Sequence, residues 1–281
     1  MPGTLFVVAT PIGNLEDITL RALRVLREAD VIAAEDTRRT AKLLGHHAIS
    51  TPTLSFHEHN TRSRLPQIIA RLEGGERVAL VTDAGTPGVS DPGVELVVAC
   101  IERGIVLDPI PGPSAPLVAS LASGFSLESL TILGFPPSRS KARAEWLKRA
   151  AEVKGTFTFF EAPHRIRQTL EEARVYLVNR PIMLGREITK HHQEFIRGDI
   201  HDVIGLLTNP RGEFTIVVGP LAEVTAAKVD VPDDVVLHEF WYLTEHCVGS
   251  RLQAVTAVAK KYGRTSRDVY SLIERSKKSG V

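Results

Sequence analysis

The chain reads Asp83-Ala84-Gly85-Thr86-Pro87-Gly88-Val89-Ser90-Asp91-Pro92-Gly93 between two apolar segments. Residues 78–82 before it are typical of a buried strand, and residues 94–101 after it have the apolar spacing of a helix. A strand, a glycine- and proline-rich loop and a helix in this order form the ligand crevice of open α/β sheets. We therefore expect this loop to belong to a ligand site rather than to a plain connection.

The residues of the loop suit such a role. Its glycines let the backbone approach a ligand closely, because they carry no Cβ. Ser90 or Asp91 is expected to cap the helix that follows, with Pro92 in its first turn.

The composition is that of an ordinary globular protein. A length of 281 residues suggests about two domains, and 43% apolar and 24% charged residues leave enough for a sizeable core. A net charge of +1 does not mark the whole chain as a nucleic-acid binder. Cys100 and Cys247 give neither a disulfide framework nor a zinc spacing, which predicts a reducing cytoplasm. We expect no signal peptide and no membrane span.

The first part of the chain alternates between strand-like and helix-like segments. This order predicts βαβ units and a mainly parallel sheet, whose functional loops lie at one edge. The expected loops are 10–14, 35–38, 83–93 and 111–115. The expected strands are 5–10, 31–34, 53–56, 78–82 and 105–110, and the expected helices are 19–28, capped by Thr19, and 64–72.

The second part changes pattern after a helix expected at 141–151. The short separation of the strands at 182–185 and 194–197 favours an antiparallel pair. Further strands are expected at 156–160 and 213–218. We predict three domains: α/β domains at 1–120 and 121–221, then a linker and basic helical domain at 222–281.

The last domain resembles a helix-turn-helix. Helices are expected at 236–245 and 252–261, followed after Gly263 by a helix at 267–275 that Ser266 caps. Residues 251–281 hold eight Lys or Arg and two acidic residues, a local net charge of +6. This surface could face phosphates, or it could be a solvated helical face; the sequence favours neither.

Several familiar sites are excluded by their motifs. The chain has no P-loop, no nucleophile elbow and no H-E-x-x-H, and the turn Thr10-Pro11-Ile12-Gly13-Asn14 is not a dinucleotide fingerprint. His57 and His59 could share one strand face, but solvated loop histidines are commoner than metal ligands, so no metal is expected.

Five motifs occur together in order along the chain. They are residues 10–17 (TPIGNLED), 35–38 (EDTR), 83–93 (DAGTPGVSDPG), 111–115 (PGPSA) and 186–190 (REITK). In this order they closely resemble the ribosomal RNA small subunit methyltransferase I family, within the tetrapyrrole methylase superfamily. The resemblance covers residues 3–220, and more loosely the basic tail.

The resemblance implies a class III methyltransferase fold: two α/β domains with the cofactor cleft between them, plus a small α-helical C-terminal domain. It implies S-adenosyl-L-methionine as cofactor, a homodimer, and 2′-O-methylation of a cytidine in 16S rRNA of the small ribosomal subunit. Adenine needs a flat apolar slot with a few polar contacts, which agrees with these loops. The implied cofactor contacts are Pro11, Asp83, Ala84, Gly85, Gly88, Val89, Ser114, Ala115, Phe160, Glu161 and Thr215.

Chemical roles follow as hypotheses. The ribose hydroxyl loses a proton, so Glu187 is the candidate base, and Lys190 could stabilise the alkoxide unless an ion pair holds it. Arg186 is the third candidate at the reacting centre. Salt bridges are the alternative for each, and Asp36 is an alternative helix cap. Candidate phosphate contacts are Arg38, Arg165, Arg186, Lys260, Lys261, Arg264 and Arg267.

Three other functions stay open. A porphyrinoid methyltransferase would carry a glycine-rich first loop, G-x-G-P-G-D, which residues 10–14 do not match. A non-enzymatic RNA-binding assembly factor would keep the fold without binding the cofactor. A DNA-binding regulator using the tail is disfavoured, because the motif-rich part lies elsewhere.

Overall fold

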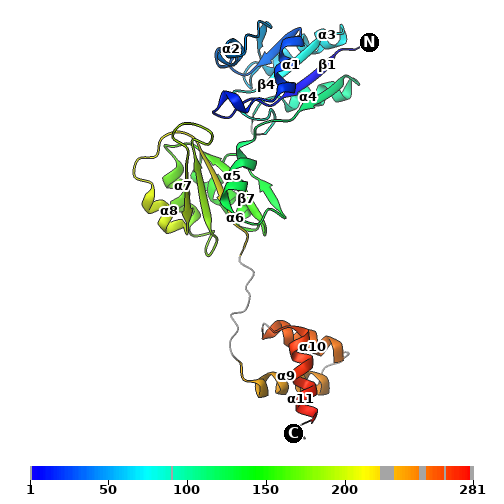
Figure 1. The fold of residues 1–281 in the computed structure, drawn as a ribbon, viewed down its shortest axis with the longest axis vertical. Helices are drawn as coiled ribbons and strands as arrows, with labels where there is room; N and C mark the ends of the chain where they lie inside the picture. The colour runs from blue at the N-terminus through cyan, green and yellow to red at the C-terminus, as the bar shows by residue number, and fades with distance from the viewer. Residues whose placement is uncertain (1, 90, 222–230, 247–250, 263, 279–281) are drawn as a thin grey trace. The chain divides into compact units, whose positions relative to one another are not determined.

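The computed structural model describes residues 2–89, 91–221, 231–246, 251–262 and 264–278 (Figure 1). The chain divides into two compact units, residues 1–221 and 222–281. Ser90, Cys247 and Gly263, and most of the predicted linker, lie outside the described residues. The predicted boundary between residues 120 and 121 stays a prediction.

Five parallel strands form the first sheet, in the order β3-β2-β4-β1-β5. The predicted parallel α/β sheet is therefore confirmed. The strands are β1 (Thr4–Val8), β2 (Val31–Ala34), β3 (Thr53–Ser55), β4 (Arg77–Val81) and β5 (Val106–Ile110). The helices of this part are α1 (Leu20–Glu28), α2 (Thr37–His46), α3 (Thr61–Glu73) and α4 (Val94–Glu102), with a 3-10 turn η1 (Leu15–Asp17).

Helices cover both faces of this sheet, which is why its central strands are mostly apolar on both sides. Alternate residues point to opposite faces. On one face, Phe6 and Val8 pack with Val25 of α1 and Leu43 of α2. On the other, Leu5, Val78 and Leu80 pack in a cluster with α3 and α4.

The second sheet is mixed and has the order β6-β7-β10-β8-β9. β8 and β9 pair antiparallel, as predicted, and β6 pairs parallel with β7. The strands are β6 (Leu130–Ile132), β7 (Thr156–Glu161), β8 (Ile182–Arg186), β9 (Glu194–Gly198) and β10 (Phe214–Val218). The helices are α5 (Ala115–Ser123), α6 (Ser140–Ala151), α7 (Ile166–Ala173) and α8 (Ile200–Leu206).

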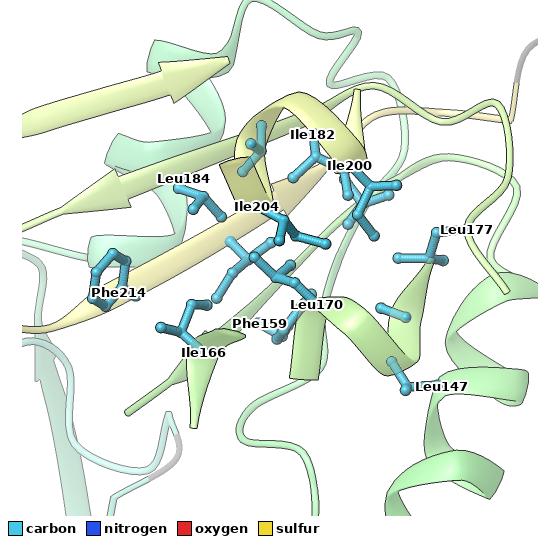
Figure 2. Packing of buried hydrophobic residues seen from close by; sticks show 14 of the residues in the cluster. Leu147, Phe159, Ile166, Leu170, Leu177, Ile182, Leu184, Ile200, Ile204 and Phe214 are labelled. Carbon is cyan, nitrogen blue, oxygen red and sulfur yellow. The ribbon is translucent and has the colours of Figure 1, made fainter. Parts of the chain in front are cut away.

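One core holds α6, α7 and α8 against the second sheet. Figure 2 shows Phe159, Leu170 and Ile204 packed together in it. In a separate cluster, Ala119 of α5 packs with Met183 and Val217 of the sheet, and Ile12 from the first part of the chain joins them. This second cluster therefore links the two sheets within residues 1–221.

The C-terminal unit is a group of three helices, α9 (Asp233–His246), α10 (Arg251–Lys261) and α11 (Ser266–Lys278). Phe240, Val258 and Val269 are among its buried apolar residues. The prediction that Ser266 caps the last helix is wrong, since Ser266 already belongs to α11. The Thr265 hydroxyl accepts a hydrogen bond from the Asp268 amide at 3.1 Å, and the Asp268 carboxylate accepts one from the Thr265 amide at 3.2 Å.

None of the described helices combines the length and the apolar character that crossing a membrane requires.

Candidate active site

The loops at the carboxyl edge of the first sheet are joined to one another. The Thr10 amide donates to the Gly85 carbonyl at 2.9 Å, and the Gly85 amide donates to the Thr10 carbonyl at 3.0 Å. Gly85 has φ of 82°, a left-handed conformation that favours glycine. The first and third predicted loops therefore meet at this edge, as a parallel sheet requires.

A cavity of about 410 Å³ opens between these loops and the second sheet. Its size falls within the range of small-molecule sites. Residues of the first part that line it are Ile12, Glu35, Arg39, Asp83, Ala84, Gly85, Thr86, Val89, Asp91, Ser114, Ala115 and Pro116. From the second sheet and its loops come Phe135, Phe160, Glu161, Ala162, Pro163, Ile188, Glu213, Phe214 and Thr215.

The cavity lining includes most of the residues predicted to contact the cofactor. Pro11 and Gly88 are not among them: Pro11 is buried, and Gly88 has φ of 85° in the turn of its loop. The contacts themselves remain predictions. The predicted residues in the lining are Asp83, Ala84, Gly85, Val89, Ser114, Ala115, Phe160, Glu161 and Thr215.

The expected cap of the helix after the long loop is wrong. The N-cap of α4 is Gly93, which has φ of 130° and offers no side chain. A Cβ there would lie 2.8 Å from Leu80 Cδ2, so the loop passes too close to β4 for another residue. Asp91 and Pro92 precede the helix, and Asp91 instead lines the cavity.

Three carboxylates lie on the first-sheet wall of the cavity. Asp83 accepts a hydrogen bond from the Asp36 amide at 3.0 Å and pairs with Arg39 at 3.3 Å. Glu35 accepts a hydrogen bond from the Asp83 amide at 3.2 Å. Asp91 has no ion-pair partner among the described residues. We call Glu35, Asp83 and Asp91 the first-wall carboxylates.

Burial, together with neighbouring negative charge, raises the pKa of two of these groups, Asp91 and Glu35. Burial raises the pKa of Asp91 from 3.8 to about 7, with further contributions from the negative charges of Glu35 and Asp83. Burial also raises the pKa of Glu35, and the charge of Asp83 adds to this effect. An acid whose pKa lies near neutrality inside a cavity is typical of a functional site.

Arg39, rather than the predicted Arg38, faces the cavity. The Asp36 carboxylate holds the Arg38 guanidinium at 2.7 and 3.0 Å, and this side chain is 88% exposed. The same hydrogen bonds hold the pKa of Asp36 well below its usual range. Asp36 also caps α2 through the Arg38 amide at 2.9 Å, which confirms the capping alternative.

Arg165 supports the second-sheet wall. It donates to the Pro136 carbonyl at 2.7 Å and pairs at 3.1 Å with Glu161, whose carboxylate is fully buried. Glu161 also accepts hydrogen bonds from the Thr169 hydroxyl at 2.6 Å and the Ala162 amide at 2.8 Å. This arrangement favours the salt-bridge alternative for Arg165 over a phosphate contact.

Glu187 and Lys190 pair with each other and are absent from the cavity lining. Lys190 Nζ lies 3.0 Å from Glu187 Oε1 and 2.9 Å from Glu213 Oε2, and Glu187 also accepts the Glu213 amide at 2.8 Å. Burial alone would raise the pKa of Glu187, but these hydrogen bonds lower it overall. The geometry therefore does not support Glu187 as a base, and an ion pair does hold Lys190.

The loop that carries this pair is strained. Glu187 has φ of 48° and Thr189 has φ of 66°, both unusual for residues other than glycine. The loop packs closely against Gly13 in the first part of the chain. A Cβ added at Gly13 would lie only 2.6 Å from Lys190 Cγ. Strain of this kind is concentrated at functional sites. Ile188, in the same loop, lines one side of the cavity.

Arg186 and the basic tail are largely engaged in internal contacts. Arg186 donates to the Arg211 carbonyl at 2.9 Å and pairs with Glu194 at 3.1 Å. In the C-terminal unit, Lys261 pairs with Glu239 at 2.6 Å, and Arg264 donates to the Val231 carbonyl at 2.6 Å. Arg267 is exposed, and the Lys260 side chain lies outside the described residues.

The sequence interpretation missed several lining residues. Glu35 directly follows β2 and lies in the expected functional loop 35–38, but it was not named as a contact. Phe135 was missed because β6 before it was not predicted; its ring lies 5.2 Å from that of Phe160. No group of three or more His, Cys, Asp or Glu in the described ranges is arranged to hold a metal ion.

Comparison with known proteins identifies the class. Residues 4–204 match the family Tetrapyrrole (Corrin/Porphyrin) Methylases. The fold is also that of a uroporphyrin-III-C-methyltransferase from Thermus thermophilus (TM-score 0.56, 21% identity, 80% of this chain and 97% of that one). A diphthine synthase gives a TM-score of 0.62 at 14% identity, over 78% and 90% of the two chains. The chain belongs to the tetrapyrrole methylase family, which confirms the predicted fold class.

Nearer relatives narrow this class. A protein of Halalkalibacterium halodurans named ribosomal RNA small subunit methyltransferase I is 42% identical over 96% of this chain and 94% of its own length. A protein of the same name from Thermotoga maritima is 45% identical over 77% of this chain and 98% of its own length. The predicted relationship is thereby confirmed, and the chain is a methyltransferase.

Proposed function

We propose that the chain transfers a methyl group from S-adenosyl-L-methionine to the ribose 2′-hydroxyl of a cytidine in 16S rRNA of the small ribosomal subunit. The observation that carries the proposal is the 42% identity over 96% of the chain to the Halalkalibacterium relative of that name. The Thermus thermophilus uroporphyrin-III C-methyltransferase of the same fold was solved with S-adenosyl homocysteine.

The residues of the cavity suit this cofactor. Phe135 and Phe160 offer tilted aromatic faces with centroids 5.2 Å apart, and Pro163 adds an apolar surface on the same wall. A planar adenine binds such surfaces by stacking. Ser114, Glu35 and Asp83 supply polar partners for ribose hydroxyls and the amino group of the methionine part.

The bound cofactor would supply an activated methyl group on a sulfonium centre. What the chain then has to contribute is position, exclusion of water and a place for the hydroxyl proton. Correct orientation of two reactants can provide effective molarities on the order of 10⁵–10⁸ M. The strained loop at Glu187 and Thr189 and the Thr10–Gly85 bridge hold the two walls in place.

The experiment is a transfer assay with labelled S-adenosylmethionine. The acceptors are small subunits from cells lacking this modification, naked 16S rRNA and a precorrin. We expect label on RNA, at a cytidine whose 3′ linkage resists alkaline cleavage. Label on a base or on the precorrin would contradict the proposal, and cofactor binding without transfer to any acceptor would favour an assembly factor.

We further propose a homodimer that works in the cytoplasm, where ribosomal subunits assemble. An exposed apolar stripe on α4 supports the dimer: Val94, Val98 and Ile101 are 52%, 45% and 62% exposed. Their spacing places them on one helix face. Val98→Asp is expected to give monomers by light scattering, whereas Leu20→Asp, at an 86% exposed position on α1, should not. A wild-type monomer would contradict the dimer.

A further inference from the structure

The cavity contains more carboxylates than cofactor binding needs. Glu35, Asp83 and Asp91 lie on the first wall, and Glu161 and Glu213 on the second. A ribose hydroxyl gives up its proton during methyl transfer, so one of the groups near it must accept that proton. The hydrogen-bond partners of each carboxylate decide which of them is free to do so.

The second-wall carboxylates are occupied. Glu161 is fully buried and accepts hydrogen bonds from Ala162, Arg165 and Thr169. Glu213 pairs with Lys190 at 2.9 Å. A carboxylate whose lone pairs are held by cations and N–H groups is a weak base.

Two of the first-wall carboxylates are also occupied. Asp83 binds the Asp36 amide and the Arg39 guanidinium, and Glu35 binds the Asp83 amide. Asp91 differs from all four, since no described residue donates a hydrogen bond or a positive charge to its side chain at contact distance. Its lone pairs therefore remain available to a group inside the cavity.

The surroundings of Asp91 strengthen its basicity. Glu35 follows β2 and Asp83 follows β4, and both place negative charge near it. Arg39 of α2 is the cation of this wall, and it pairs with Asp83. His57, after β3, interacts with Glu35. With burial, these charges raise the pKa of Asp91 to about 7, where a base is half-deprotonated and still accepts a proton well.

We propose that Asp91 is the general base that takes the proton from the attacking ribose hydroxyl. This assignment rests on the proposed function. As the hydroxyl oxygen forms its bond to the methyl carbon, the carbon–sulfur bond breaks and its electron pair stays on sulfur. The hydroxyl proton moves to a carboxylate oxygen of Asp91, which later releases it to water, so no oxidant or further reactant is required.

The test compares Asp91→Asn, Asp91→Glu and wild type in two readouts. Single-turnover methyl transfer to small subunits is measured from pH 5.5 to 9, and S-adenosylhomocysteine binding is measured by calorimetry. Wild-type rates should rise with unit slope below about pH 7 and then level off. The plateau transfer rate of Asp91→Asn should be about 100-fold or more below that of wild type, and its rate should no longer rise with pH below about pH 7. Asp91→Glu should recover part of the rate and the pH dependence.

Glu213→Gln, at the second wall, is the matched control and should keep the wild-type midpoint. Cofactor affinity of Asp91→Asn should stay within about threefold of wild type, because a base acts on the hydroxyl. A parallel loss of affinity and rate would overturn the assignment in favour of cofactor binding. An active Asp91→Asn with the wild-type profile would overturn it while leaving the methyltransferase proposal intact. Wild-type enzyme that methylates no ribose would overturn both.

Discussion

The two walls of the cavity use carboxylates in opposite ways. On the second wall, Lys190 bridges Glu213 and the nearby Glu187, and Arg165 pairs with Glu161, so each of these carboxylates contacts a cation. On the first wall, three carboxylates share one cation, Arg39, and Asp91 is left without it. Paired charges stabilise a shape, whereas uncompensated charges are costly and are kept where a reaction uses them. The difference separates a supporting wall from a reactive one.

The largest effect on stability is expected from breaking the paired wall. Lys190→Met would leave Glu187 and Glu213 without their cation, and the Glu187 side chain is only 21% exposed. We expect the free energy of unfolding to fall by about 1–3 kcal/mol, measured by urea denaturation at pH 7. Lys190→Arg keeps the positive charge, so its free energy of unfolding should fall by less than that of Lys190→Met. Equal stability of all three proteins would show that the pair does not hold the loop.

At the reactive wall, we expect a substitution to raise the free energy of unfolding instead of lowering it. Between about pH 4 and pH 7, folded Asp91 keeps a proton that the unfolded chain has released, so its raised pKa costs stability as the pH rises. Asp91→Asn should therefore be more stable than wild type at pH 8, by about 1–2 kcal/mol after solvent screening, and nearly equal at pH 4. Thermal unfolding at both pH values measures this. A variant that is less stable than wild type at pH 8 would contradict an uncompensated charge at this position.

Changing the neighbours of Asp91 should move its titration in both directions. Glu35→Gln removes a negative charge, so the midpoint of the pH–rate profile should move down, by up to about one pH unit. Arg39→Ala removes the cation of the same wall, so the midpoint should move up. Rates between pH 5.5 and 9 test both variants. Shifts in the same direction would show that the midpoint does not report on this wall.

The smallest effect is expected from the carboxylate that the sequence alone had favoured as base. Glu187→Gln keeps an acceptor for the Glu213 amide and weakens the contact with Lys190. Turnover should fall by less than about tenfold, with the pH midpoint unchanged, since a lost positioning contact costs on the order of 1 kcal/mol. A loss above 100-fold without loss of stability would restore Glu187 as the base.

Much of the fold could be predicted because its signals are local. The strands β2 and β4 are almost entirely apolar and end in acidic or glycine-rich loops, so the parallel sheet and its common loop edge followed from the sequence. β6 was missed: it has only three residues, Leu130–Ile132, none of them buried, and unlike the equally short β3 it had no neighbouring pattern to mark it. Missing it also hid Phe135, which lines the cavity just after it.

The chemistry of the site was harder to predict, because the partners of a side chain are set by folding. Glu187 and Lys190 lie in a motif, but the motif does not reveal that they neutralise each other. Arg38 and Arg39 are adjacent, and only the capping of α2 by Asp36 decides which of them reaches the cavity. Asp91 suggested a helix cap because acids commonly occupy such positions, whereas Gly93 begins the helix.

The most direct test is a carbon-detected NMR titration of the side-chain carboxyls in wild type and Asp91→Asn, from pH 4 to 9. We expect one aspartate carboxyl that titrates near pH 7 in the wild type and is absent from the variant. A wild-type spectrum in which every aspartate has finished titrating below about pH 5, near the ordinary range for aspartate, would contradict it.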